Sequence, residues 1–181
     1  VLAWGHNVYG EVGDNTNVDK SIPVTITGFV NTTVRGVFPG DYTSHVIDLA
    51  SSQTSWGGNI YGQIGDNTTT DRWTPKWITG SGNLAMMDGG RAHTVAIGRD
   101  GSVHTWGDNS YGEIGRLGAP WYPYAISGMN DYVDATAGTG DYSAALYSPW
   151  SKSAIDGVSS DAGKFSSTAT DGSGNVHTVY Y

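Results

Sequence analysis

The chain has 181 residues, no cysteine and a formal net charge of −8 at pH 7. Without cysteine it can form neither disulfide bonds nor cysteine-ligated zinc sites, and its acidic balance argues against binding to a nucleic-acid backbone, where basic stripes would be expected. No apolar run approaches the length of a membrane span. Enzymes, binding modules and assembly proteins remain as function classes.

One motif occurs three times and sets the organisation of the chain. Its copies begin at Trp4, Trp56 and Trp106, a period of about 50 residues, and share the pattern W-G-x-N-x-Y-G-[EQ]-[VI]-G. Such a period is typical of an array in which neighbouring units cover one another's apolar faces. The recurring residues are Trp4, Gly5, Asn7, Gly10 and Gly13, then Trp56, Gly57, Asn59, Gly62 and Gly65, then Trp106, Gly107, Asn109, Gly112 and Gly115.

Short runs rich in β-branched residues alternate with Gly, Asn, Asp and Pro clusters, and they predict short antiparallel strands. The clearest runs are 24–26, 45–49, 94–97 and 103–106. Four short strands in about 50 residues have the size of one propeller blade. We therefore predict an all-β fold, a β-propeller or partial propeller, in which the recurring Trp and the Ile or Val before the third glycine pack between blades.

The repeat resembles the regulator of chromosome condensation (RCC1) repeat family in its bacterial-type form, W-G-x-N-x-x-G-Q-[LI]-G-D-x-T-x-x-x-R-x-x-P. The second copy matches this form best, through Gln63, Asp66, Thr68, Arg72 and Pro75. The resemblance covers about residues 1–147, and it implies a ring of RCC1-like blades, usually about twice as long as this chain.

The third copy departs from that pattern at Arg116, where the first two copies have aspartate, and it is two residues shorter before its proline. Both differences fall in a loop, so we expect them to alter local shape and not the fold.

Residues 1–147 are predicted to hold the three repeats, and residues 148–181 a degenerate repeat or a closing β-hairpin of the same propeller. The position 50 residues beyond Trp106 is Asp156, but a hairpin pattern resumes at 163–170 and 176–180. Open blade faces need cover. We therefore expect a piece of a longer protein, a processed chain, or a subunit that completes its ring with copies of itself.

Motifs of known chemistry are missing: there is no G-x-S-x-G, no phosphate-binding loop and no HExxH. His104 and His177 stand at equivalent strand positions and are interpreted as structural, and the Asp-Gly pairs at Asp100 and Asp171 as hairpin turns. We predict no enzymatic activity, no catalytic or metal-binding residue and no cofactor.

Aromatic residues gather where the repeat does not require them, and they are the candidate binding residues. Trp73 and Trp121 occupy the same place in successive units, each two residues before a proline. They form either a contact patch on one side of the propeller or a cover over the outer strand of their own blade. They are Trp73, Trp77, Trp121, Tyr122 and Tyr124.

The predicted function is a non-enzymatic binding or assembly module, extracellular or on the cell surface because charged residues are only 14% of the chain. The expected partner is a protein, including further copies of the chain. A carbohydrate-binding module that stacks sugars on the loop aromatics is the alternative, and a guanine-nucleotide exchange factor, the activity best known in the resembled family, is a further one. Sequons at Asn31 and Asn67 are candidate glycosylation sites.

Overall fold

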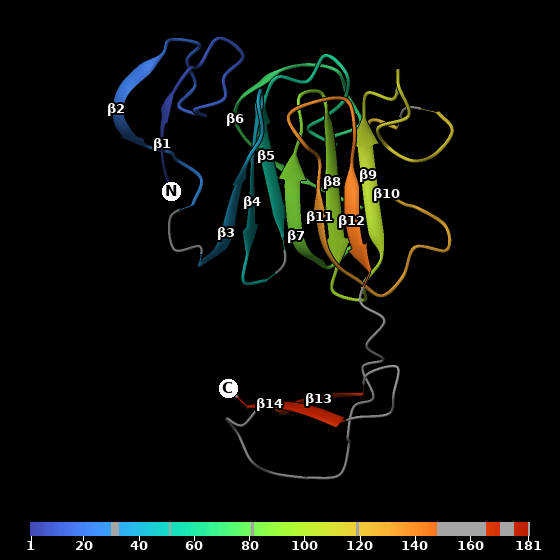
Figure 1. Ribbon diagram of the computed structural model, residues 1–181. Helices are drawn as coiled ribbons and strands as arrows, with labels where there is room; N and C mark the ends of the chain where they lie inside the picture. Colours follow the sequence, from blue (N-terminus) through green and yellow to red (C-terminus); the bar gives the residue numbers. More distant parts are fainter. Residues whose placement is uncertain are drawn as a thin grey trace. The chain divides into compact units, whose positions relative to one another are not determined.

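The computed structural model describes residues 1–29, 33–50, 52–80, 82–118, 120–147, 166–170 and 176–180, and it divides the chain into two units, Val1–Tyr147 and Ser148–Tyr181. The described residues form strands, turns and loops without a helix, which confirms the all-β prediction (Figure 1). Asn31 and Asp156 lie outside the described residues.

Two four-stranded antiparallel sheets form the middle of the first unit, and each corresponds to one repeat. Each sheet pairs its strands in the order of the chain, as the propeller prediction requires. The first consists of β3 (Val34–Pro39), β4 (Thr43–Asp48), β5 (Gln53–Gly57) and β6 (Arg72–Ile78), and the second of β7 (Leu84–Gly89), β8 (His93–Gly98), β9 (Val103–Gly107) and β10 (Tyr124–Ala125).

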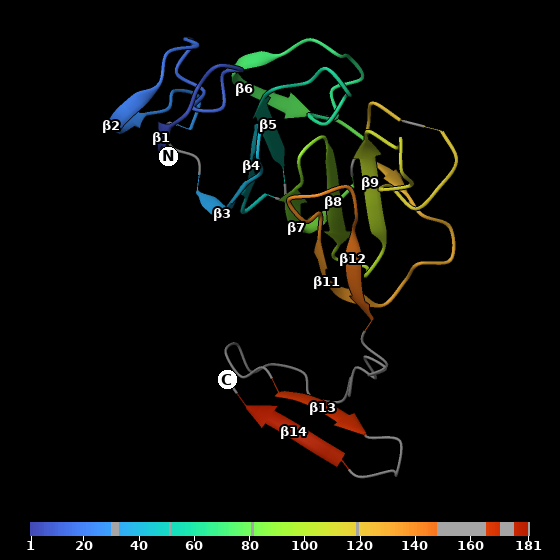
Figure 2. The same ribbon diagram turned by 45° about the horizontal axis from the view of Figure 1, so that its top comes forward.

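Two further two-stranded pairs belong to this unit: β1–β2 lies beside the first sheet, at the left of Figure 1, and β11–β12 lies in front of the second sheet (Figures 1 and 2). β1 (Leu2–Gly5) pairs with β2 (Lys20–Thr25), and because β1 carries the Trp-Gly of the repeat, this pair corresponds to the third and fourth strands of a blade. β11 (Tyr132–Thr136) pairs with β12 (Ala144–Tyr147), with the same register shift near its start as the β3–β4 and β7–β8 pairs. The β11–β12 pair therefore corresponds to the first and second strands of a blade.

The second unit contains one described hairpin. β13 (Ser166–Thr170) and β14 (Val176–Tyr180) pair antiparallel in a continuous register, from Ser166 opposite Tyr180 to Thr170 opposite Val176. The two strands lie within the hairpin pattern predicted at 163–170 and 176–180, of which residues 163–165 fall outside the described residues.

The apolar core lies between successive sheets, where each unit covers its neighbour. Trp56 packs with Val12 and Ile26 of the preceding unit, and Trp106 packs with Ile47 and Leu84. A third cluster joins β8 and β9 to Ala135 and Ala137 beside β11. β8 is buried along its whole length, because it lies inside its sheet and has neighbours on both faces. β3 lies at the edge of its sheet, and its residues alternate between half-buried and exposed.

Candidate binding face

The loop that follows the third strand of each blade is fastened by one asparagine. The Nδ2 atom of Asn59 donates to the carbonyl oxygens of Thr68 and Thr70, each at 3.0 Å, while its Oδ1 atom accepts from the backbone N–H of Ile64 at 2.9 Å. A buried amide that satisfies several backbone groups at once holds the loop in one shape. Tyr61, three residues before Ile64, is thereby held on the face of the blade. Asn7 and Asn109 make the corresponding contacts in their own loops.

A carboxylate fastens the second half of the same loop. Asp66 accepts from Thr68 Oγ1 at 2.6 Å and from Arg72 Nε at 2.7 Å. Burial opposes the charged form of Asp66, but these hydrogen bonds and the arginine charge outweigh it and lower the pKa of that carboxyl. Asp14 makes the equivalent ion pair with Lys20, and its pKa is lowered to about 2 for the same reasons.

The third loop is built differently, because Arg116 stands where the other two have aspartate. Its guanidinium lies 4.0 Å from the ring centre of Tyr124, a cation–π contact that replaces the carboxylate anchor. The loop still closes through Asn109, whose Nδ2 donates to the Arg116 carbonyl at 2.7 Å. The substitution therefore changes the local contacts and keeps the blade, as predicted.

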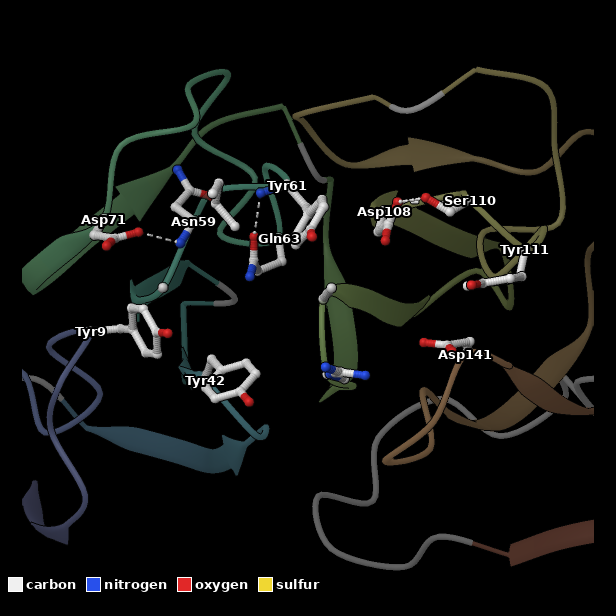
Figure 3. Close-up of a pocket in the computed structure, with 14 residues that line it drawn as sticks. Tyr9, Tyr42, Asn59, Tyr61, Gln63, Asp71, Asp108, Ser110, Tyr111 and Asp141 are labelled. Atoms are coloured by element: carbon white, nitrogen blue, oxygen red, sulfur yellow. Dashed lines mark hydrogen bonds between the residues drawn. The ribbon is translucent and has the colours of Figure 1, made fainter.

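These loops surround a pocket of about 550 Å³ to which several units contribute (Figure 3). Tyr9, Tyr61 and Tyr111 are the same motif position in three repeats, and Tyr42 comes from the turn between β3 and β4. Tyr9 and Tyr42 meet edge to face at 5.2 Å. Figure 3 shows this pair on one side of the pocket and Asp108, Ser110, Tyr111 and Asp141 on the other. The full lining is Tyr9, Tyr42, Gly58, Asn59, Ile60, Tyr61, Gln63, Asp71, Arg91, Ala92, Asp108, Ser110, Tyr111 and Asp141.

The electrostatic character of the pocket is acidic, with three aspartates and one arginine in its lining. Asp71 uses one carboxylate oxygen to accept from the backbone N–H of Asn59 at 2.7 Å, and Asp108 uses one for Ser110. Asp141 also lines the pocket, and its charge acts on the ring of His93. Several carboxylate oxygens thus remain available to a ligand. An aromatic and acidic surface of this kind suits a cation.

The aromatic residues singled out from the sequence lie elsewhere, at the outer side of the blades. The ring of Trp73 packs on Gly10, and that of Trp121 packs on Gly62, so each covers a glycine of the preceding unit. Their carbonyls accept from the N–H groups of Asn15 and Asn67 respectively, both at 2.8 Å. Trp73 and Trp121 remain 42% and 46% exposed. They join neighbouring units and also present part of their rings to solvent.

The other three predicted aromatics are half-exposed. Trp77 stands on β6 opposite Thr54, and Tyr122 and Tyr124 form an edge-on pair at 6.2 Å. None of the five predicted aromatics lines the pocket. The pocket tyrosines were missed because Tyr9, Tyr61 and Tyr111 were treated only as part of the repeated motif, and the motif does not indicate which of its side chains face solvent.

The contact of Trp121 with Gly62 gives a stability prediction with a matched control in the same protein. Gly62 and Gly112 are equivalent and have φ values of 79° and 91°, but only Gly62 has a neighbour that an added Cβ would strike. Gly112→Ala should cost about 1–2 kcal/mol in backbone strain alone. Gly62→Ala should cost about 1–3 kcal/mol more, because the Trp121 ring must move. Urea unfolding at pH 7 measures both, and equal costs would contradict the packing role.

Within the described residues, no cluster of three or more histidine, aspartate or glutamate side chains is arranged to hold a metal ion. The same part of the chain contains no helix long and apolar enough to cross a membrane.

Repeated four-stranded antiparallel sheets that pack face to face, with loops of successive units around one pocket, define a propeller-type repeat protein. Sequence models of the regulator of chromosome condensation (RCC1) repeat match residues 1–47, 55–97 and 87–113, together more than half of the chain. The chain belongs to the RCC1 repeat family.

Curated relatives share these repeats over most of the chain. The human probable E3 ubiquitin-protein ligase HERC4 is 31% identical over 118 residues, which are 64% of this chain and 11% of HERC4. The ultraviolet-B receptor UVR8 of Arabidopsis thaliana is 26% identical over 153 residues, 82% of this chain and 35% of UVR8. The chain thus spans about a third or less of these relatives.

Solved structures confirm the RCC1-like propeller fold. Human WBSCR16 superposes with a TM-score of 0.70 at 19% identity, over 80% of this chain and 40% of WBSCR16. Prp20p of Saccharomyces cerevisiae, described with its binding to Gsp1p and histones, also gives a TM-score of 0.70, at 16% identity, over 80% of this chain and 38% of Prp20p.

Proposed function

We propose that the protein is a non-enzymatic binding module whose tyrosine and aspartate pocket takes a basic segment of a partner protein. The observation that carries this proposal is the pocket itself: three equivalent tyrosines from successive units stand around it together with three aspartates. An arginine or lysine side chain stacks on a tyrosine face and pairs with a carboxylate, so one cationic residue satisfies both features.

The rigidity of the loops supports this proposal. Asn59 and the ion pair of Asp66 with Arg72 fix the loop that carries Tyr61, so little conformational entropy is lost when a ligand binds. The net charge of −8 adds a long-range attraction for basic partners. Protein partners are also named for a family member of the same fold, since Prp20 is described with Gsp1p, with histones and with Kap60.

A peptide pair tests the charge requirement directly. An octapeptide of alternating arginine and glycine should bind, and the same peptide with citrulline in place of arginine should bind at least about fivefold more weakly, because citrulline keeps the shape and lacks the charge. Isothermal titration calorimetry at two salt concentrations measures both, and the affinity of the arginine peptide should fall as salt rises. Equal binding of the two peptides, or none, would refute the proposal.

Substitutions in the lining test whether the arginine peptide binds in the pocket. Asp71→Asn with Asp108→Asn keeps the local hydrogen bonds and removes two charges, so we expect about a threefold to tenfold loss of affinity. Tyr61→Ala should cause a similar loss through the missing ring. Asp131→Asn is the matched control, because Asp131 is exposed, lies outside the pocket lining, and has a φ of 66°, which asparagine tolerates. Its affinity should equal that of the unchanged protein.

Carbohydrate binding is a second candidate, because Trp73 and Trp121 repeat on successive units with half-exposed rings and Trp77 lies on the same strand as Trp73. Sugars stack on such rings, and a glycan array tests this. We also propose an extracellular or cell-surface location, supported by the low content of charged residues. Fractionation of the source cells tests the location.

A further inference from the structure

The turn before the second strand meets the residue after the third strand in both four-stranded sheets, so the two sheets can be compared position by position. In the first sheet the carbonyl of Tyr42 accepts from the backbone N–H of Gly58 at 2.7 Å. In the second sheet the carbonyl of Ala92 accepts from the backbone N–H of Asp108 at 2.9 Å. Ala92 thus stands in the place of Tyr42, and Asp108 in the place of Gly58.

A motif tyrosine from the preceding unit belongs to each of these places. At the first junction it is Tyr9, whose ring meets that of Tyr42 edge to face at 5.2 Å. At the second junction it is Tyr61, and Ala92 offers only a methyl group where Tyr42 has a ring. The backbone N–H of each motif tyrosine donates to the side chain two residues further on, at 2.8 Å and 3.0 Å, so the two loops hold their tyrosines alike. The second junction therefore has one ring and leaves the place of the other to the pocket.

The second junction also carries a carboxylate where the first has none. Asp108 accepts through Oδ1 from the backbone N–H of Asn109 at 2.8 Å and from Ser110 Oγ at 2.7 Å. These bonds fix the carboxylate, and Oδ2 is the oxygen that can accept from a ligand. Figure 3 shows Asp108 and Ser110 among the residues around the pocket. A phenyl ring in the place of Tyr42 would cover this charge without pairing with it, so the place suits a planar group that is also a cation.

We propose that Tyr61, Ala92 and Asp108 form an arginine subsite, in which a guanidinium group of the partner takes the place that the Tyr42 ring holds at the first junction. This inference rests on the proposed function and adds which cation the pocket prefers. A guanidinium is planar and can stack on a tyrosine while its edge donates to a carboxylate, whereas the ammonium of lysine is a compact point charge. Arg91 also lines the pocket, and it repels both cations alike, so it lowers the affinity and keeps the preference.

Two peptides tested on the unchanged protein measure the preference. The octapeptide of alternating arginine and glycine should bind at least about fivefold more tightly than the same peptide with lysine in place of arginine, because the charge is equal and only the planar group differs. Isothermal titration calorimetry at pH 7 and one salt concentration measures both affinities. Equal affinities, or tighter binding of the lysine peptide, would overturn the arginine subsite and leave the proposed function standing. Absence of binding by either peptide would refute both.

Filling the subsite tests its position. Ala92→Tyr gives the second junction the ring of the first, and it should lower the affinity for the arginine peptide at least about tenfold. Ala125→Tyr is the matched control, because Ala125 is exposed on β10 and lies outside the pocket lining. Its affinity should equal that of the unchanged protein. Circular dichroism checks that each variant is folded, and full affinity in a folded Ala92→Tyr protein would overturn the proposal.

Moving the subsite to the first junction gives a readout in the opposite direction. Tyr42→Ala with Gly58→Asp copies the residues of the second junction beside Tyr9. The backbone of Gly58 is outside the left-handed region, and an added Cβ would lie 3.3 Å from its nearest neighbour, so an aspartate fits there with a small shift. Introduced together with Ala92→Tyr, this pair should restore the affinity to within about threefold of the unchanged protein. A folded triple variant that stays as weak as Ala92→Tyr would contradict the assignment of the three positions.

Discussion

Replacing Trp106 by alanine is expected to lower the free energy of unfolding by about 3–5 kcal/mol. Trp106 is 0% exposed and packs with Ile47, Leu84 and Met87 at the junction of two sheets. Alanine would leave a cavity there and remove the indole donor from the carbonyl of Gln63. Because the units stabilise one another in series, the loss should destabilise both sheets together.

Two further variants separate the causes of that loss. Trp106→Phe keeps most of the apolar volume and removes the indole N–H, and it should cost about 1–2 kcal/mol because Thr94 still donates to the Gln63 carbonyl. Trp77→Ala, at a ring 49% exposed, should cost less than about 1 kcal/mol. Urea unfolding followed by far-ultraviolet circular dichroism measures all three. Similar costs for Trp106→Ala and Trp77→Ala would contradict the packing described here.

The sequence carried enough information to predict the blades. The spacing of Trp4, Trp56 and Trp106 and the β-branched runs between turn clusters defined strands that the structure contains. That inference succeeds because the blade is a local unit of about 50 residues whose turns depend on glycine at fixed positions. Strands of weaker pattern, such as β7 with its Leu84–Gly89 sequence, were not singled out, because their place is set by pairing with β8.

The repeat pattern could not predict which side chains surround each copy of the motif. Trp106 is fully buried because it donates to the carbonyl of Gln63 in the loop of the preceding unit and packs with Ile47 and Leu84, and the motif around Trp106 contains none of these partners. Trp73 illustrates the same limit. The sequence offered a contact patch or a cover over its own blade. The ring packs on Gly10 of the preceding unit, a contact that neither alternative included, and Trp73 remains 42% exposed, so the contact patch stays a prediction.

The pocket could not be assembled from the sequence for a related reason. Tyr9, Tyr61, Tyr111 and Asp141 are far apart in the chain, and only the stacking of the units brings their loops to one face. Periodicity indicates which positions are equivalent, but it does not distinguish a tyrosine that packs inside a blade from one that faces solvent. The face that each loop presents is a property of the assembled sheets.

Acidification to pH 4.5 should destabilise the protein, and His45 should be a principal cause. Its side chain is fully buried, and its Nε2 and Nδ1 atoms lie 3.0 Å from Thr43 Oγ1 and 2.8 Å from Ser55 Oγ. Burial lowers the pKa of His45 from the ordinary value of 6.5 to about 3. The unfolded chain therefore takes up a proton below about pH 6.5 that the folded chain does not accept.

The sign of the effect follows from that difference. Stability contributed by neutral His45 is fully present above pH 6.5 and is lost as the pH falls toward 3, so the free energy of unfolding should drop by about 2–3 kcal/mol between pH 7.5 and pH 4.5 from this residue alone. His93 and His104, whose pKa values burial also lowers, act in the same direction. Asp14, with a pKa of about 2, contributes only at lower pH.

A double variant isolates the part due to His45. His45→Val with Ser55→Thr copies the opposed pair Val95 and Thr105, which occupies the equivalent place in the next sheet. The double variant therefore removes the titrating ring and replaces it with a pair of side chains that the same fold already contains. Urea unfolding at pH 7.5 and pH 4.5 gives the change in unfolding free energy for each protein. That change should be about 2–3 kcal/mol smaller in the double variant. If the two proteins lose the same amount, His45 is not held neutral by its burial, and the pH dependence must come from the other buried histidines.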